Sequence, residues 1–189
     1  MKNRLIAIAA LLLVAFSWVS CIDPEQTQEV IFQKDKEAIE KYLRDNPFDD
    51  AVKEYGLVND AFYIFWEKSV SESINGEMLV GDTVTVNYTG KLLSNVVFDS
   101  SIEQVAKANQ VFQNGREYKP LTFPNGLGAF LNGFEFAISK MRAGEKATVI
   151  FPSTMGYGST PRDRIPANSP LIFEIELIQV KRGKNHTNP

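Results

Sequence analysis

The residue types that most often carry out nucleophilic or metal chemistry are scarce in this chain. Its 189 residues contain one Cys and one His, Cys21 and His186, which lie near opposite ends. A catalytic triad, a Cys–His pair or a Cys/His zinc site would have to be built from these two residues. Asp99, Glu103 and Asp163 are nominal carboxylates for a hydrolase, but nothing in their spacing favours that chemistry. The sequence therefore favours a site that works without a thiol, a histidine, a metal or a cofactor.

The composition is that of one globular domain with short additions. Hydrophobic residues make up 44% of the chain, charged residues 23%, and there are 13 Phe. This is enough apolar material to bury a core, so disorder is a poor description of the whole. The length fits one medium domain or at most two small ones. A net charge of −3 gives no indication of nucleic-acid binding.

The N-terminal residues have the pattern of a secretory signal. Two basic residues precede an uncharged, largely apolar run at 5–19, and Cys21 follows it. The run is shorter than the roughly 20 residues that a membrane span needs. Residues 18–21 resemble a bacterial lipobox, apart from Trp18 in place of the usual aliphatic residue. We expect a signal peptide at 1–20 and a lipid on Cys21, which would anchor the protein in the bacterial cell envelope, facing the periplasm or in the outer membrane. The alternative is an ordinary cleaved signal.

Residues 23–46 combine charged side chains with apolar ones spaced mostly three, four and seven apart. This spacing predicts an amphipathic helix that begins at an Asp-Pro pair and stops at an Asn-Pro pair. The helix is either a spacer or dimerisation arm or a helix packed on its own domain. Residues 49–59 are polar and predict a linker or a short helix, so we expect a lipid-anchored helical spacer over 21–60.

From residue 61 onward the apolar period changes to two. Alternating or β-prone segments predict strands at 61–67, 83–88, 146–151 and 171–177, each with one buried face. One helical pattern at 130–141 ends at a Gly stop. Several antiparallel strands and one short helix predict an α+β fold, in which a curved sheet, or half-barrel, wraps the helix. We expect the tail at 182–189 to be polar and frayed, with a solvated His186.

Six short motifs follow one another in the predicted domain. They are Tyr88-Thr89-Gly90, Phe98-Asp99-Ser100-Ser101, Gly133-Phe134-Glu135, Gly156-Tyr157-Gly158, Ile165-Pro166 and the strand at 171–177. Each is weak alone, but in this order and on these elements they resemble the FKBP-type peptidyl-prolyl cis-trans isomerases. The resemblance implies an isomerase domain at 61–181.

The same resemblance implies which residues form the site. Five match the family's catalytic pocket walls: Tyr88, Phe98, Asp99, Tyr157 and Phe173. Five more match its substrate-binding positions: Leu121, Phe130, Leu131, Phe134 and Ile165. Ile165 matches the loop residue whose backbone N–H holds the substrate carbonyl. No metal or cofactor is implied.

The chain departs from the family pattern in three places. Phe134 stands where the best-known members have a Trp at the pocket floor, so the apolar ring is kept and the indole N–H is lost. Residues 102–119 form a much longer segment than small members have, which implies a flap or surface helix beside the pocket, or a surface insertion without a role. Residues 153–157 form an approach to the tyrosine that is one residue longer than usual.

Rotation about an X-Pro bond suits such a pocket because no covalent bond has to be made or broken. The barrier is about 18–20 kcal/mol and the two isomers differ by about 1 kcal/mol. Twisting the amide breaks its resonance and reduces its dipole, so a dry aromatic pocket favours the twisted state. The Tyr157 phenol would donate to a substrate carbonyl. Asp99 would either orient Tyr88 or interact with the twisted carbonyl carbon.

The sequence therefore predicts a peptidyl-prolyl isomerase that assists the folding of exported or envelope proteins. Its partners would be proline-containing unfolded or flexible segments and, through the N-terminal lipid, a membrane. The alternative is a prolyl-peptide-binding chaperone or complex subunit with weak or no turnover.

Overall fold

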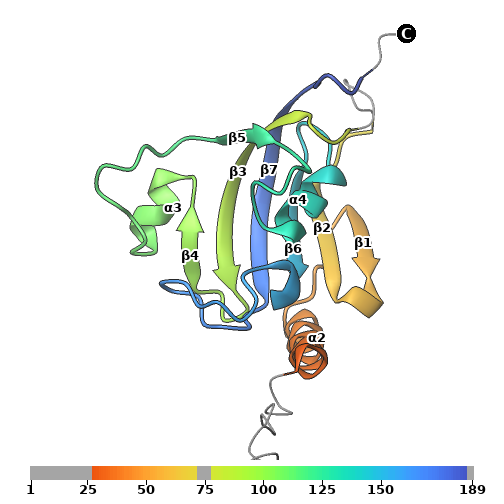
Figure 1. Ribbon diagram of the computed structural model, residues 1–189, viewed down its shortest axis with the longest axis vertical. Coiled ribbons are helices and arrows are strands. Elements are labelled where there is room, and N and C mark those ends of the chain that lie inside the picture. Colours follow the sequence, from red (N-terminus) through yellow and green to blue (C-terminus); the bar gives the residue numbers. More distant parts are fainter. Residues whose placement is uncertain (1–26, 72–77, 187–189) are drawn as a thin grey trace, which may run out of the picture. The chain divides into compact units, whose positions relative to one another are not determined.

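The protein is described by a computed structural model that covers residues 27–71 and 78–186. Over these residues the chain forms a seven-stranded antiparallel sheet with the order β1-β2-β6-β7-β3-β4, and β5 pairs with β3 (Figure 1). The strands are β1 Lys53–Leu57, β2 Phe62–Lys68, β3 Thr83–Leu92, β4 Val97–Ser100, β5 Leu121–Pro124, β6 Lys146–Phe151 and β7 Leu171–Lys181. The predicted α+β fold with a curved antiparallel sheet and one short helix is confirmed.

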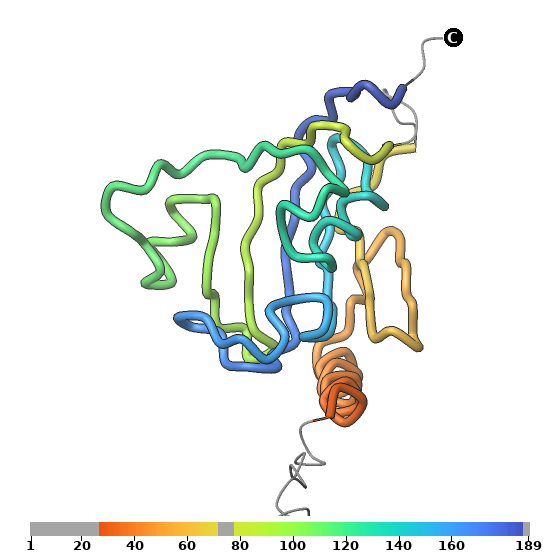
Figure 2. The backbone as a smooth tube through the Cα atoms, viewed as in Figure 1, coloured from red at the N-terminus to blue at the C-terminus, as the bar shows by residue number. Residues whose placement is uncertain are grey.

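The centre of the sheet is the pair of long strands β3 and β7. One edge of β3 pairs with β7 along its full length. The other edge is divided, because residues 83–86 pair with β5 and residues 89–91 pair with β4. The chain therefore leaves the sheet after β4 and returns at β5, and the long segment between them passes beside the sheet (Figure 2).

Helix α4, Asn132–Ser139, packs on one face of the sheet. Gly133 allows this close approach, because a Cβ there would lie 2.5 Å from the Phe151 ring. Phe134, Ala137 and Ile138 point from the helix into the main core, which also contains alternate residues of β2, β6 and β7. The helix predicted at 130–141 is thus shorter than expected, since it begins after Leu131, whose backbone is extended, and ends at Ser139.

Helix α2, Gln28–Asp45, contributes to a second core on the opposite face. From Phe32 onward its apolar side chains pack against Ala61, Ile150 and Ile172, which alternate with main-core residues along the strands. The expectation of one buried face is therefore wrong for β6, which is buried on both faces from Ala147 onward. Of the two alternatives for this helix, packing on its own domain is what these residues do.

Over residues 49–59, where we expected a linker or a short helix, the structure has mainly a strand and, at the end, the start of a short 3-10 helix. The strand is β1, which pairs with β2 from Lys53↔Trp66 to Leu57↔Phe62, and the 3-10 helix is η3, Val58–Asp60. β1 is an edge strand with mostly exposed or half-buried side chains. Tyr55 and Leu57 pack against the main core from one side of this short strand, and pairing with β2 fixes its register.

The C-terminal residues up to His186 are held against the domain. The Gly183 N–H donates to Asp82 Oδ1 at 2.7 Å, and the His186 Nε2 lies 2.8 Å from Asp82 Oδ2. Asp82 is 1% exposed, so the imidazole meets a buried carboxylate. The expectation of a frayed tail with a solvated His186 is wrong for residues 182–186.

Two expectations lie outside the described residues: the signal at 1–20 and the lipidation site Cys21. Within the described part, no helix is long and apolar enough to cross a membrane. Residues from Phe32 onward form one compact unit, and residues up to Ile31 are assigned to another. The division of function between 21–60 and 61–181 stays a prediction.

Candidate functional site

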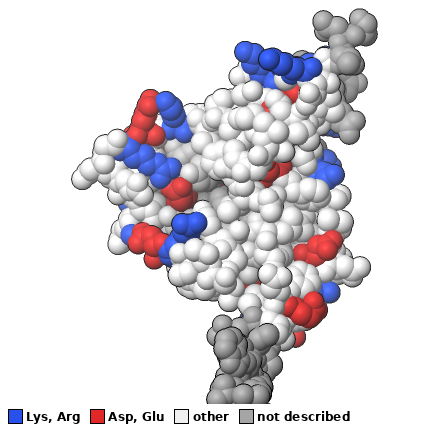
Figure 3. All heavy atoms as spheres, in the orientation of Figure 1, with Lys and Arg blue, Asp and Glu red and all other residues white. Residues whose placement is uncertain are grey.

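A cavity of about 160 Å³ is lined by residues of β3, β4, β5 and β7, by α4 with the two residues before it, and by the loop between β6 and β7. Nine of the ten pocket residues that the resemblance implied line it. They are Tyr88, Phe98, Asp99, Leu121, Phe130, Leu131, Phe134, Tyr157 and Phe173. In the space-filling view most of this face carries no charge, and Lys, Arg, Asp and Glu lie mainly around its margin, at the left, where β4 and α3 lie, at the top and at the right (Figure 3).

The floor of the cavity is a group of buried rings. Phe134 is 3% exposed and Phe173 is 5% exposed, and their ring centroids are 5.0 Å apart. Tyr88 meets Phe134 edge to face at 5.9 Å, and Phe98 meets Phe173 in the same way at 5.6 Å. Tilted and edge-to-face rings pack favourably and leave a surface without hydrogen-bonding groups. The floor is therefore apolar and closely packed.

Gly90 explains why these rings converge on β3. It lies opposite Asp99 of β4 and opposite Phe173 of β7. A Cβ on Gly90 would lie 2.4 Å from the Phe98 ring and 3.1 Å from the Phe173 ring. The two rings occupy the space above the glycine backbone, so the motif Tyr88-Thr89-Gly90 supplies a wall residue and the gap beside it.

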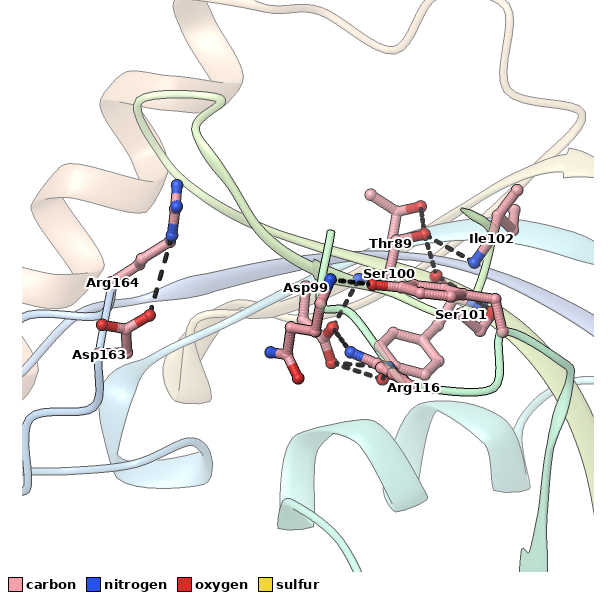
Figure 4. Close-up of polar contacts among 11 residues, drawn as sticks. Thr89, Asp99, Ser100, Ser101, Ile102, Arg116, Asp163 and Arg164 are labelled. Atoms are coloured by element: carbon pink, nitrogen blue, oxygen red, sulfur yellow. Dashed lines mark hydrogen bonds and ion pairs between the residues drawn. The ribbon is translucent and has the colours of Figure 1, made fainter. Parts of the chain in front are cut away.

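Tyr88, Asp99 and Arg116 form a polar cluster at the edge of the floor (Figure 4). The Tyr88 hydroxyl donates to Asp99 Oδ2 at 2.6 Å, and Arg116 forms an ion pair with Asp99 Oδ1. Arg116 also donates to the Tyr88 hydroxyl oxygen at 3.2 Å. Burial, and then the hydrogen bond to Asp99, raise the pKa of Tyr88, while Asp99 raises the pKa of Arg116. Tyr88 thus stays a neutral donor and Arg116 stays charged.

Two buried serines after Asp99 fix the polar cluster to the sheet. Ser101 donates its N–H to the Tyr88 carbonyl at 3.0 Å, and its hydroxyl accepts from the Tyr88 N–H at 3.0 Å. Ser100 shares a hydrogen bond with Thr89 at 3.0 Å. The motif Phe98-Asp99-Ser100-Ser101 therefore combines two wall residues with two residues that hold β4 in register.

Tyr157 reaches the cavity from the loop that joins β6 to β7. Its pKa is raised, mainly by burial, so the phenol is a donor at neutral pH. The Arg162 guanidinium lies over its ring at 5.4 Å. This loop starts with the 3-10 helix η4, Ser153–Met155, in the approach that the sequence singled out as one residue longer.

Ile165 does not line the cavity. It is 5% exposed and packs into the main core, and its N–H donates to the Arg162 carbonyl at 3.0 Å. In this structure a tight turn between Arg162 and Ile165 pairs the N–H, and the expectation that it holds a substrate carbonyl stays a prediction.

The sequence missed two residues that organise the site. Arg116 lies in the long segment, far along the chain from Asp99, and a single arginine in a loop carries no signal of its own. The segment forms helix α3, Glu103–Ala108, and its Arg116 reaches Asp99 at the cavity edge. A functional role for the segment stays a prediction. Glu135 of α4 accepts three backbone hydrogen bonds, from Gly126, Gly128 and Phe130, and so shapes the loop that carries Phe130.

The nominal hydrolase carboxylates are not brought together. Asp163 is exposed and lies 3.8 Å from Arg164, and in Figure 4 this pair lies apart from Asp99. Glu103 pairs with Lys107 within α3. The arrangement offers a dry aromatic floor with neutral phenols and one paired carboxylate at its edge.

The sequence model of the family described as FKBP-type peptidyl-prolyl cis-trans isomerase matches residues 76–178. FK506-binding protein 2 of Yarrowia lipolytica is 39% identical over 101 residues, which cover 53% of this chain and 61% of that protein. An FK506-binding protein of Neisseria meningitidis is 33% identical over 60% of this chain and 93% of its own length. The chain thus spans less than two thirds of the first of these relatives.

Solved structures agree on the fold. A peptidyl-prolyl cis-trans isomerase from Pseudomonas syringae superposes with a TM-score of 0.56 at 20% identity, covering 82% of this chain and 97% of that one. The matched family region contains every residue that lines the cavity. This chain belongs to the family of FKBP-type peptidyl-prolyl cis-trans isomerases.

Proposed function

We propose that this protein catalyses cis-trans rotation about X-Pro bonds in flexible polypeptide segments. The observation that carries the proposal is the cavity itself: a floor of buried rings with the Tyr88–Asp99–Arg116 cluster at its edge. A proline ring is apolar and compact, so it fits such a floor. The amide that precedes it would then lie among the Tyr88, Asp99 and Tyr157 side chains.

The pocket residues would lower the barrier by favouring the twisted amide. A planar amide has a large dipole that is well solvated in water and poorly solvated over Phe134 and Phe173. Twisting reduces that dipole, so transfer to the dry floor costs the twisted state less. A ten-thousandfold acceleration requires under about 6 kcal/mol of such differential stabilisation.

Asp99 is held as a polar edge rather than as a proton carrier. It accepts from Tyr88, from the Ser100 N–H at 2.8 Å and from Arg116. These partners fix the carboxylate toward Tyr88, which favours an orienting role over proton transfer. Because phenols and carboxylates have ordinary pKa values far from 7, we expect kcat/KM to be flat between about pH 6 and pH 8.

The test is an isomerisation assay on an X-Pro tetrapeptide whose cis fraction is followed after a solvent jump. The proposal expects first-order relaxation that accelerates in proportion to protein concentration, with Tyr157→Phe and Asp99→Ala as weakened variants. Relaxation at the uncatalysed rate with micromolar wild-type protein would overturn it. Heat-unfolded protein in the same assay controls for trace contamination.

A binding module without turnover is the second candidate, and one observation favours it. Phe134 gives an apolar floor that has no N–H donor, so the pocket can hold a proline ring with less discrimination between ground state and twisted state. Peptide binding at the pocket, measured by titration, with no acceleration of exchange would select this candidate.

We further propose that the chain acts on exported or envelope proteins as a lipoprotein. The support is the lipobox-like residues 18–21 and the apolar run before them. Mass spectrometry of the N-terminal peptide from membranes of a bacterial host would test this. A diacylated Cys21 is the expected product, and an unmodified N-terminus after residue 20 would contradict it.

A further inference from the structure

A buried acidic residue of helix α2 is hydrogen-bonded to the loop that carries Tyr157. Asp35 is 3% exposed and lies on the same helix face as Phe32 and Ile39, which pack into the second core. Its Oδ2 accepts from the Ser153 N–H at 2.8 Å and from the Ser153 hydroxyl at 2.6 Å. Ser153 is 1% exposed, so both partners are shielded from water.

The connection continues from Ser153 to Tyr157 through the backbone. The Ser153 carbonyl accepts from the Gly156 N–H and from the Gly158 N–H, each at 2.9 Å. These two bonds lie on either side of Tyr157 and determine the direction in which its side chain leaves the loop. The Gly158 carbonyl in turn accepts from the Asn168 N–H at 2.8 Å, which joins the loop to the chain just before β7.

Burying a carboxylate in this place costs free energy of folding, which suggests that Asp35 has a role in fixing the geometry of the loop. Desolvation raises the pKa of Asp35, and the two hydrogen bonds from Ser153 only partly offset that effect. An apolar residue at position 35 would pack α2 against the second core without this desolvation cost. What the carboxylate adds is a specific acceptor for the first N–H of η4, which has no side-chain cap of its own. The same segment is the one that is longer than the family pattern by one residue.

We propose that Asp35 is a positioning residue for Tyr157, acting through Ser153, so that helix α2 is part of the substrate site although it lies on the opposite face of the sheet. The kinetic test of this role rests on the proposed function, and an NMR test does not. Removal of the carboxylate frees the Ser153 turn, and the Tyr157 phenol then samples positions from which it meets a substrate carbonyl poorly.

A double-mutant cycle on the full chain tests the proposal kinetically. We expect Asp35→Ala to lower kcat/KM for an X-Pro peptide by about tenfold, because displacements near 1 Å can cost up to a hundredfold. In a Tyr157→Ala background the same substitution should change kcat/KM by less than about twofold. Equal losses in both backgrounds would show that Asp35 acts on folding alone and would overturn the proposal.

Two variants keep the cycle decisive. Asp35→Asn retains an oxygen acceptor of the same shape and should restore kcat/KM to within about threefold of wild type. Tyr42→Phe is the matched control, since it removes another α2 side-chain hydrogen bond to the rest of the domain, from the Tyr42 hydroxyl to Asn95 Oδ1 at 3.0 Å. It should leave kcat/KM unchanged. If Asp35→Ala does not fold, Ser153→Ala takes its place in the cycle with the same expected pattern.

Fluorotyrosine labelling separates this proposal from the proposed function. The Tyr157 signal is identified by its loss in Tyr157→Phe, and it should shift or broaden in Asp35→Ala and not in Tyr42→Phe. A wild-type protein without isomerase activity would remove the proposed function and leave this result to decide the positioning role. An unchanged Tyr157 signal in Asp35→Ala would overturn the positioning role whatever the activity.

Discussion

Two carboxylates in this domain have nearly the same hydrogen-bonding chemistry and very different surroundings. Asp99 accepts from the Tyr88 hydroxyl at 2.6 Å, and Glu145 accepts from the Trp66 indole N–H at 2.8 Å. Glu145 is fully buried, with further bonds from the Ser69 hydroxyl and the Arg142 N–H, each closer than 3.0 Å. The side chain of Asp99 is 32% exposed and lines the cavity.

The difference shows what separates a functional cluster from a structural one here. All the partners of Glu145 belong to the protein, and the group has no route to a substrate. Asp99 has similar partners on one side, and its other side faces an open, apolar cavity. An aromatic donor paired with a carboxylate is therefore not a sign of a site by itself, and the opening beside it supplies the missing part.

The largest effect that the comparison predicts is on stability. Glu145→Ala leaves the Trp66, Val70 and Arg142 donors without their acceptor, and we expect the free energy of unfolding to fall by about 4 kcal/mol. Chemical denaturation of both proteins measures this. Well below its unfolding midpoint the variant should keep wild-type kcat/KM. A loss of activity in the folded variant would mean that Glu145 also supports the site.

At Asp99 we expect the opposite result, a large loss of activity with little loss of stability. Asp99→Ala removes a half-exposed carboxylate, so we expect the free energy of unfolding to change by less than about 1 kcal/mol. Because the Tyr88 hydroxyl loses its main acceptor, kcat/KM should fall about thirtyfold, which corresponds to about 2 kcal/mol. Stopped-flow isomerisation and denaturation on one protein preparation measure both. An Asp99→Ala protein that is unstable and fully active would contradict a functional role for Asp99 and indicate a structural one.

A smaller effect is expected from Arg116, which contacts both Asp99 and the Tyr88 hydroxyl. Arg116→Met keeps the aliphatic stem and removes the ion pair with Asp99, and kcat/KM should fall about threefold, as half-exposed ion pairs contribute up to about 1 kcal/mol. Lys119→Met is the control in the same segment, because Lys119 pairs with Glu117 away from the cavity lining. Equal effects of the two substitutions would indicate a general charge effect.

The smallest expected effect is a pH dependence of stability that comes from Glu145. Burial raises its pKa, but the hydrogen bonds from Arg142, Ser69, Trp66 and Val70 outweigh it, so the net pKa lies below the ordinary value. The stabilisation from a lowered carboxylate pKa is complete above the ordinary value near 4.3 and is lost as the pH falls through the lowered one. The stability of wild type relative to Glu145→Gln should therefore decrease below about pH 4. A constant difference from pH 7 to pH 3 would contradict the lowered pKa.

The sequence was most informative where packing on one buried face determines the type of residue. Apolar alternation predicted β3, β6 and β7 because a buried face repeats every second residue, and an aromatic, β-prone run predicted β2. The cavity residues followed from ordered motifs, each of which combines a wall residue with a residue that holds the backbone, such as Phe98 beside Ser100. Where packing on one face determines the residue type, the pattern is visible in the chain.

Other features depend on partners that are distant in the sequence. β1 has two core-facing residues, Tyr55 and Leu57, which are too few to predict a strand, and pairing with β2 fixes its register. Ile172 and Ile150 are buried only because α2 covers the outer face. Arg116 reaches Asp99 only after α3 has turned the long segment back toward β5. None of these contacts leaves a periodic or local signal, so the structure was needed to find them.

The most direct test of the account is one isomerisation experiment with three proteins. Exchange between the cis and trans signals of an X-Pro peptide is measured by NMR in the presence of wild type, Asp99→Ala and Glu145→Gln, at a temperature where all three are folded. The account predicts rapid exchange with wild type and with Glu145→Gln, and exchange slowed about thirtyfold with Asp99→Ala. Exchange at the uncatalysed rate with wild type, or an equal loss in both variants, would contradict it.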